Sequence, residues 1–141
     1  MNILIINGPN LNMLGIREKS IYGTKTYKDL IKFIKNVARE NDVKVKVLQS
    51  NYEGKIIDAI HKAYRKYDSI IINPGALTHY SYAIYDALKA VNIKTVEVHL
   101  TNIYNRENFR SISVIKDACS ASFVGKGFDS YREAIEYLKG V

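Results

Sequence analysis

Two polar residues within an apolar segment are the first candidates for chemistry. Glu97 and His99 alternate in the stretch 95–100, where the positions between and after them are Val98 and Leu100. Alternate residues of a strand point to the same face, and a buried ionised carboxylate needs a partner. Glu97 can therefore orient His99, whose imidazole titrates near neutral pH and can donate a proton. A histidine at a strand end is also commonly structural, so the pair alone specifies no reaction.

A long polar segment near the N-terminus carries two further candidates, Arg17 and Tyr22. The segment 7–23 is rich in Asn and Gly, and it is far longer than the roughly 2–6 residues that usually join a strand to a helix. Long connections in compact domains are commonly lids or binding loops. We expect a lid loop at about residues 10–23, with a passive surface loop as the alternative.

Periodicity predicts the elements that position these residues. Short apolar runs indicate strands, and helical spacing indicates helices. The expected strands are 3–6, 43–48, 69–72, 95–100 and 122–124, and the expected helices are 26–40, 53–67, 79–91 and 130–139. Thr26 is the expected N-cap of the first helix, and Ser130 with Glu133 matches a capping box for the last one.

The alternation of strands and helices predicts an α/β fold built from βαβ units. We expect a flavodoxin-like three-layer αβα sandwich with a five-stranded parallel sheet in the order 2-1-3-4-5, forming one domain over residues 1–141. In such sheets, ligands bind beyond the carboxyl ends of the strands, where the strand order reverses. Polar residues follow those strand ends at 7–10, 49–51, 73–79 and 99–102. Each segment alone indicates only a turn, but their convergence at one sheet edge predicts a site.

Composition limits the classes of function. The chain has 141 residues, a net charge of +7, three histidines and a single cysteine, Cys119, so we expect neither a disulfide framework nor a metal site. No apolar run approaches the ~20 residues of a membrane span, and residues 1–6 lack the features of a signal peptide. A cytoplasmic location without a membrane partner is therefore expected. The basic residues are dispersed, and those of the helix at 26–40 form a solvated face, which favours a small anionic ligand over a nucleic acid.

Four blocks of sequence, in order along nearly the whole chain, resemble the motifs of type II 3-dehydroquinate dehydratases. Any one block alone would be weak, but four at consistent spacing are very specific. The blocks are Asn7-Gly8-Pro9-Asn10-Leu11 with Arg17-Glu18 and Tyr22-Gly23; Gln49-Ser50-Asn51 with Glu53-Gly54; Asn73-Pro74-Gly75-Ala76 with Thr78-His79 and Asp86-Ala87-Leu88; and Glu97-Val98-His99-Leu100-Thr101-Asn102 with Arg106-Glu107 and Phe109-Arg110.

The resemblance implies an enzyme that converts 3-dehydroquinate to 3-dehydroshikimate, in the shikimate pathway or in quinate breakdown. The implied reaction is an anti elimination of water through an enolate, without a cofactor or a Schiff base. Tyr22 would take the proton alpha to the ketone with Arg17 beside it, and Asn10 would hold a water that hydrogen-bonds the enolate oxygen. His99, oriented by Glu97, would protonate the departing hydroxyl.

The resemblance also implies the substrate-binding positions and the assembly. The matching positions are Asn73, His79, Asp86, Leu100, Thr101, Arg106 and Arg110. The substrate carboxylate would lie near Leu100 and Thr101, and the lid-region Arg106 has the least defined role. The family forms homododecamers built from trimers, which we expect here by analogy.

The implied base requires help from its surroundings. Free tyrosine has a pKa near 10, so only about one part in a thousand is ionised at pH 7. An arginine close by can lower such a pKa by ~1–3 units, and it does not itself deprotonate. Arg17 next to Tyr22 would therefore make a tyrosinate accessible, and closure of the loop would exclude water from it.

Two other classes of protein remain open from the residues alone. The fold suggests a nucleotide or flavin binder, although Asn7-Gly8-Pro9-Asn10 is a poor phosphate cradle because Pro9 lacks an N–H. The net charge suggests a nucleic-acid or assembly module. A flavin spectrum would support the first class, and salt-dependent DNA binding without dehydratase activity would support the second.

Overall fold

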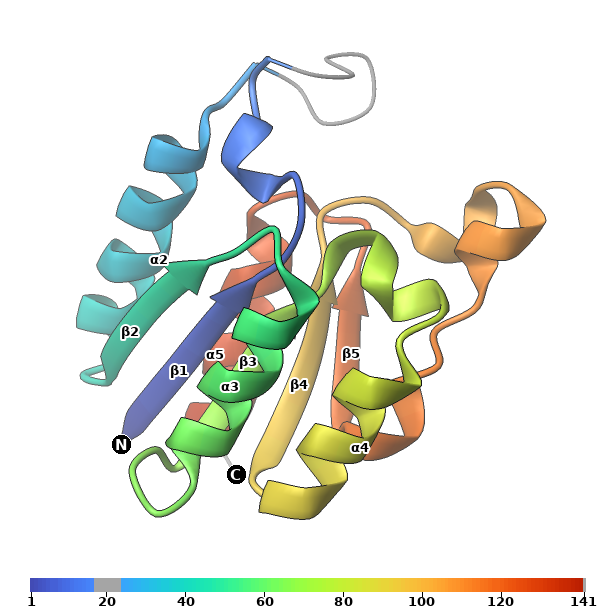
Figure 1. Ribbon diagram of the computed structural model, residues 1–141. Coiled ribbons are helices and arrows are strands. Elements are labelled where there is room, and N and C mark those ends of the chain that lie inside the picture. The colour runs from blue at the N-terminus through green and yellow to red at the C-terminus, as the bar shows by residue number, and fades with distance from the viewer. Residues whose placement is uncertain (17–23, 141) are drawn as a thin grey trace.

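The fold is a parallel sheet between two layers of helices, seen in a computed structural model that describes residues 1–16 and 24–140. Five strands pair in parallel in the order β2-β1-β3-β4-β5. They are β1 (Asn2–Asn7), β2 (Lys44–Gln49), β3 (Ser69–Asn73), β4 (Lys94–His99) and β5 (Ala121–Val124). The predicted flavodoxin-like α/β class and strand order are confirmed. The strand arrowheads in Figure 1 point to the upper edge, where the connecting segments gather.

Helices cover both faces of the sheet and bury a core on each. The helices are α2 (Tyr27–Glu40), α3 (Glu53–Ala63), α4 (Tyr82–Val91) and α5 (Asp129–Gly140). α2 and α5 share one core with Ile3 and Ile5, whereas α3 and α4 share the other with Leu4 and Ile6. This division follows from the strand period of two, because alternate residues of β1 point to opposite faces.

Short 3-10 helices lie in the connections. They are η1 (Leu11–Met13), η2 (Gly75–His79), η3 (Ile103–Asn105), η4 (Asn108–Ser111) and η5 (Lys116–Ala118). η1 follows β1, η2 follows β3, and η3 and η4 follow β4, so four of these segments extend from the carboxyl ends of three adjacent strands. These connections supply the residues that can form a site at the carboxyl edge of the sheet.

Burial along the strands follows their place in the sheet. β3 is central and entirely buried, as its run of three isoleucines at 70–72 predicts. β2 is an edge strand, and its exposed Lys44 and Lys46 alternate with the half-buried Val45 and Val47. Exposed lysines on an edge strand oppose pairing with another chain, which gives the lysines of β2 a structural explanation.

The predicted start of α2 is confirmed. Thr26 is its N-cap, and the Thr26 hydroxyl accepts a hydrogen bond from the Asp29 N–H at 3.2 Å. The Asp29 carboxylate in turn accepts from the Thr26 N–H at 2.9 Å. This reciprocal capping box satisfies two N–H groups that the first turn of a helix leaves without partners.

The prediction that a helix begins at His79 is wrong. Residues Gly75–His79 form η2, and α4 begins only at Tyr82, after the N-cap Ser81 whose hydroxyl accepts from the Ile84 N–H at 3.1 Å. A serine that caps the backbone in this way is a stronger start signal than the apolar spacing that extends back toward residue 79. His79 therefore lies on a short turn at the sheet edge rather than on a helix face.

Two other predicted helix boundaries need correction. Ser130 lies inside α5, and its hydroxyl accepts from the Lys126 N–H at 3.2 Å, while the Glu133 carboxylate pairs with Lys126 Nζ at 2.5 Å. The predicted Ser130–Glu133 capping box therefore does not form, because both side chains serve the preceding turn. α3 ends at Ala63 instead of residue 67, shortly before Arg65 adopts a positive φ of 62°.

Candidate active site

A pocket of about 620 Å³ opens at the carboxyl ends of β1, β3 and β4. This is the edge at which the sequence predicts a ligand, next to the reversal of strand order between β1 and β3. Its lining comes from the connections that follow these strands. The residues are Pro9, Asn10, Leu11, Leu14, Asn73, Gly75, Ala76, His79, His99, Leu100, Thr101, Ile103, Arg106 and Arg110.

The two turns below the pocket are in direct contact. The Gly8 N–H donates to the Asn73 carbonyl at 2.7 Å, and a Cβ at Gly8 would lie 2.6 Å from the Pro74 carbonyl oxygen. Gly75 has a φ of +60°, and a Cβ there would lie 2.9 Å from the Pro9 carbonyl oxygen. Only glycine fits at both positions, so the Asn-Gly-Pro and Asn-Pro-Gly sequences hold one pocket wall together.

His99 and Glu97 form the buried pair that strand alternation predicts. His99 Nε2 lies 2.6 Å from Glu97 Oε2, and both residues are almost inaccessible to solvent. A carboxylate can only accept, so Nε2 carries the hydrogen in this bond. Nδ1 is then the ring nitrogen through which His99 can give a proton to a molecule in the pocket.

Two hydroxyl groups complete the environment of Glu97. The Thr78 hydroxyl of η2 donates to Oε2 at 2.5 Å, and the Ser113 hydroxyl donates to Oε1 at 2.8 Å. Burial raises the pKa of Glu97, but the hydrogen bonds from His99, Thr78 and Ser113 outweigh it and hold the pKa below its ordinary value of 4.5. Glu97 is therefore ionised at neutral pH and holds the His99 ring in one orientation.

His79 is held by the backbone of a neighbouring segment. Its Nδ1 lies 2.7 Å from the Ile112 carbonyl oxygen, so Nδ1 is the donor and Nε2 of the neutral ring is an acceptor. Burial is the main cause that lowers the pKa of His79, against the opposing effect of this hydrogen bond. The neutral form is thereby favoured, and His79 offers the pocket an acceptor for a hydroxyl group.

Asn73 is oriented by a buried chain of hydrogen bonds. Its Nδ2 donates to the Tyr131 hydroxyl at 2.9 Å, and this hydroxyl donates to Asn7 Oδ1 at 2.6 Å. Asn73 Oδ1 accepts from the Gly75 N–H at 3.2 Å. Burial raises the pKa of Tyr131, which keeps this hydroxyl protonated. With both ends of the Asn73 amide assigned, its second N–H is available as a donor at the pocket.

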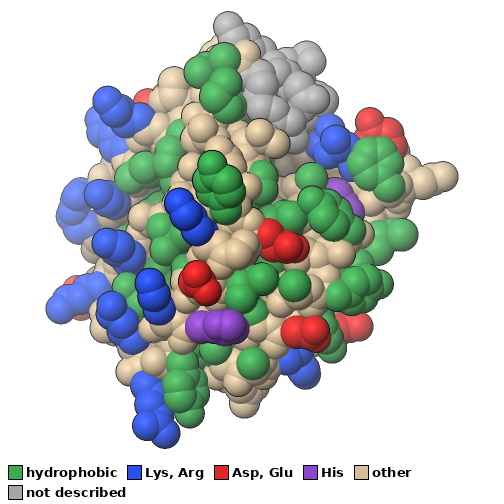
Figure 2. Space-filling model, viewed as in Figure 1, with side chains coloured by type: hydrophobic (Ala, Val, Ile, Leu, Met, Phe, Trp, Pro, Cys, Tyr) green, Lys and Arg blue, Asp and Glu red, His purple; other side chains and the backbone are tan. Residues whose placement is uncertain are grey.

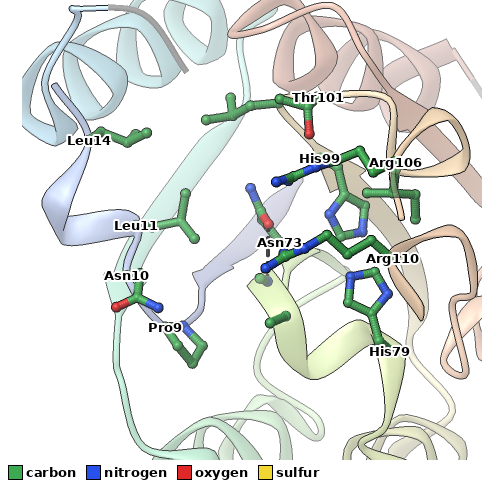
Figure 3. Close-up of a pocket in the computed structure, with 14 residues that line it drawn as sticks. Pro9, Asn10, Leu11, Leu14, Asn73, His79, His99, Thr101, Arg106 and Arg110 are labelled. Atoms are coloured by element: carbon green, nitrogen blue, oxygen red, sulfur yellow. Dashed lines mark hydrogen bonds between the residues drawn. The ribbon is translucent and has the colours of Figure 1, made fainter. Parts of the chain in front are cut away.

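Positive charge gathers on one wall of the pocket. Figure 3 shows the side chains of Arg106 and Arg110 extending inward, with His99 between them in this view and His79 below. Arg110 Nε lies 3.0 Å from the exposed Glu107 carboxylate, and its guanidinium lies 4.9 Å from the centre of the Phe109 ring. Two arginines beside neutral hydrogen-bonding groups suit an anionic, hydroxyl-bearing ligand.

Most of the predicted site residues that the structure describes come together here. Asn10, Asn73, His79, His99, Leu100, Thr101, Arg106 and Arg110 line the pocket. Glu97 lies behind His99, whereas Asp86 is exposed on α4 and is not among the lining residues. Asn10 adopts a φ of 70° and is fixed through its N–H, which donates to Asn51 Oδ1 at 3.0 Å. Arg17 and Tyr22 fall outside the described residues.

Sequence reasoning missed the side chains that orient the lining residues. Thr78 enters the sequence interpretation only as part of a family block, and Ser113 and Tyr131 are not singled out there. Each contacts its partner across a long stretch of chain, up to the 124 residues between Tyr131 and Asn7. One signal was available: a buried carboxylate such as Glu97 requires hydrogen-bond donors. This requirement does not indicate where in the chain those donors lie.

A membrane-spanning helix and a metal-binding cluster are both absent from residues 1–16 and 24–140. No helix in these ranges is long and apolar enough to cross a membrane. The same ranges contain no group of three His, Cys, Asp or Glu side chains placed to hold a metal ion.

Comparisons with known proteins agree on one family. Residues 1–139 match the family model of Dehydroquinase class II. Proteins named 3-dehydroquinate dehydratase are similar: that of Caldicellulosiruptor bescii is 58% identical over 99% of this chain and 97% of its own, and that of Clostridium acetobutylicum is 55% identical over 100% and 98%. The crystal structure of type II dehydroquinase from Butyrivibrio crossotus, 52% identical, superposes with a TM-score of 0.96 over 98% of this chain and 97% of its own. The chain therefore belongs to the class II dehydroquinase family.

Proposed function

We propose that this protein is the 3-dehydroquinate dehydratase of the shikimate pathway, a hydro-lyase that converts 3-dehydroquinate to 3-dehydroshikimate. The observation that carries the proposal is the buried pair in which Glu97 Oε2 lies 2.6 Å from His99 Nε2, at the edge of a pocket with two arginines. An oriented imidazole supplies an acid for a departing hydroxyl, and the arginines supply charge for a carboxylate ligand.

The first step is removal of the proton alpha to the ketone by Tyr22. Arg17 lowers the pKa of that tyrosine and stabilises the transition state. The electron pair of the broken C–H bond moves onto the ketone oxygen to give an enolate, and a water held by Asn10 hydrogen-bonds this oxygen. Segment 10–23 acts as the lid that brings the base to the pocket within one catalytic domain of residues 1–141.

The second step expels the hydroxyl on the opposite face of the ring. The enolate re-forms the ketone, the C–O bond breaks, and His99 Nδ1 transfers its proton so that water leaves. Glu97 stays ionised throughout and stabilises the imidazolium form before the transfer. No lysine imine forms, and no cofactor is required for this balance of protons and electrons.

The remaining pocket residues bind the substrate. Its carboxylate lies at Leu100 and Thr101, directly after β4, with Arg106 and Arg110 supplying positive charge. The ring hydroxyls meet the Nε2 acceptor of His79 and the amide donor of Asn73. The roles of His79 and Asn73 are consistent with the hydrogen bonds that already fix these two side chains.

The position of Asp86 supports an assembly of several copies. Asp86 is exposed on α4, apart from the pocket lining of its own chain. It can contribute to substrate binding only if it reaches the pocket of a neighbouring copy in an assembly. We propose the homododecamer of trimers on this ground and by family analogy, and a cytoplasmic location for the enzyme.

The test is to supply purified protein with 3-dehydroquinate and follow the absorbance of the conjugated enone product. Activity is expected without added metal or cofactor and should survive borohydride in the presence of substrate, since no imine is there to be reduced. Tyr22→Phe should nearly abolish turnover in a folded protein, and Arg17→Ala should lose most of kcat. Substantial turnover by Tyr22→Phe would refute Tyr22 as the base.

A further inference from the structure

The segment after η4 makes an unusual set of contacts with the catalytic pair. Residues 112–114 run beside the end of η2, where the Val114 N–H donates to the Thr78 carbonyl at 2.7 Å and His79 Nδ1 donates to the Ile112 carbonyl at 2.7 Å. Ser113 lies between these two bonds, and its side chain points to Glu97. The backbone therefore fixes where the Ser113 hydroxyl can lie.

Among the described residues, Ser113 is the side chain that donates a hydrogen bond to Glu97 Oε1. The Ser113 hydroxyl lies 2.8 Å from Glu97 Oε1 and 3.0 Å from Oε2, whereas the hydrogen bonds of Thr78 and His99 reach Oε2 alone. Because Oε2 is shared by His99 and Thr78, the contact at Oε1 fixes the rotation of the carboxylate about its last bond. That rotation decides whether Oε2 faces the imidazole.

We propose that Ser113 is a positioning residue for the elimination, holding the Glu97 carboxylate so that His99 is aligned and tuned as the acid. The inference deepens the proposed function and rests on it. Ser113 makes no contact with the pocket itself and is absent from its lining. It acts through Glu97, and it joins the acid to the segment that carries Arg110.

The physical consequence of removing this hydroxyl has a defined sign. A carboxylate that loses a donor carries more unbalanced negative charge, and it attracts the imidazolium proton more strongly. His99 then keeps its proton to higher pH and is a weaker acid toward the departing hydroxyl. In the pH profile of kcat, the fall on the alkaline side (the high-pH limb) should move to higher pH, and the maximal kcat should be lower.

Other titratable groups surround the pair and must be considered in that profile. They are His79 on η2, Tyr104 on η3, Arg110 on η4 and Cys119 after η5. Substitution at Ser113 changes none of these side chains. A movement of the backbone at residues 112–114 would be recognised separately. It would disturb the bond between His79 and the Ile112 carbonyl, and it would therefore alter substrate binding as well as kcat.

The experiment compares Ser113→Ala with Ser113→Thr and with the matched control Ser111→Ala. Ser111 lies two residues earlier, and its hydroxyl donates to the Asn108 carbonyl at 2.7 Å, away from Glu97. Ser113→Ala should lower kcat roughly 10- to 100-fold, the range expected for one hydrogen bond to a charged group, with a small change in KM and the upward shift of the limb. Ser113→Thr should restore most of kcat and the original limb, and Ser111→Ala should match the parent enzyme.

A merely structural role would give a different pattern. If Ser113→Ala keeps the parental kcat and pH limb, or if it loses activity with an unshifted limb that Ser113→Thr does not rescue, the inference is overturned. Ser113→Cys, a weaker donor of similar size, should be intermediate; parental kcat and limb in that folded variant would also refute the role, even if Ser113→Ala does not fold. Absence of dehydratase activity in the parent protein and in Ser111→Ala would instead refute the proposed function.

Discussion

Two of the hollows among the described residues differ in how their polar groups are held. The pocket above β1, β3 and β4 measures about 620 Å³, whereas a groove between β2 and α3 measures about 880 Å³. The groove, called here the lysine groove, is lined by the exposed Lys46, Lys55, Lys62 and Lys66 around Leu4 and Leu48. Figure 2 shows Lys and Arg side chains gathered on the left side of this face, where Figure 1 places α2 and β2, with α3 next to them toward the middle.

The larger hollow is not the better candidate for catalysis. The charges of the lysine groove are exposed to water, and one of them, Lys46 on the edge strand β2, already has a structural explanation. In the pocket, by contrast, buried Glu97 takes hydrogen bonds from three different segments, and Asn73 is fixed by Tyr131. Polar groups held in one orientation, rather than volume or net charge, distinguish a site that can do chemistry.

Removal of the acid should have the largest effect among the residues that the structure describes. His99→Ala should reduce kcat by about 10²- to 10⁴-fold, the usual contribution of a general acid, while the sheet and its cores are unchanged. Steady-state kinetics with 3-dehydroquinate and far-UV circular dichroism measure the two quantities. A variant with a kcat within a few-fold of the parent would move the catalytic acid away from His99.

Arg110→Ala should act on binding more than on turnover. Loss of one charge-assisted hydrogen bond to the substrate is expected to raise KM by about 10- to 100-fold, with kcat changed less. Arg110→Lys is the matched control, because it keeps the charge and loses the planar fork of the guanidinium. Its KM should lie between the KM of the parent enzyme and that of Arg110→Ala. An equal fall of kcat in both variants with unchanged KM would argue against a role in binding.

Glu97→Gln tests how strongly the pair is coupled to folding. The Gln carbonyl oxygen is a single acceptor where the carboxylate receives three donors, so we expect a loss of about 1–3 kcal/mol in the free energy of unfolding at pH 7. The pKa of Glu97 is lowered in the folded state, so its stabilisation is present above the unfolded value of 4.5 and is lost as pH falls through the folded value.

The pH dependence separates this effect from simple packing. Urea unfolding of parent and Glu97→Gln should show a difference that is constant from pH 7 to about 5 and then shrinks on further acidification. A difference that stays constant down to pH 3 would mean that the ionised carboxylate contributes no stability.

Changes in the lysine groove should have the smallest effect. The double variant Lys46→Ala with Lys62→Ala removes two exposed charges far from the catalytic pair, and kcat/KM should stay within about twofold of the parent at 0.15 M salt, where such charges are screened. A large rise in KM that persists at this salt concentration would indicate that the groove, and not the pocket, receives the substrate.

The features predicted from sequence are those with a local cause. Strand alternation placed Glu97 and His99 on one face, and the Thr26 cap follows from the chemistry of three neighbouring residues. The start of α4 was misplaced because apolar spacing continues through η2, and the Ser130 cap failed because its hydroxyl serves Lys126. Local patterns cannot distinguish such competing partners.

The contacts that orient the site have no local cause. Ser113 reaches Glu97, and Tyr131 reaches Asn7 and Asn73, only after the sheet has been assembled. A buried carboxylate predicts that donors exist, but it does not say which hydroxyl supplies them. The identities of Tyr22 and Arg17 as base and partner came from family resemblance, since spacing alone does not show that they meet.

The most direct test is a crystal structure of the Tyr22→Phe protein with 3-dehydroquinate bound. The substrate should occupy the pocket above β1, β3 and β4, with its departing hydroxyl within hydrogen-bond distance of His99 Nδ1 and its carboxylate at Leu100 and Thr101. Density for the substrate in the lysine groove, or in the pocket with His99 directed away from the departing hydroxyl, would contradict the assignment of His99 as the acid.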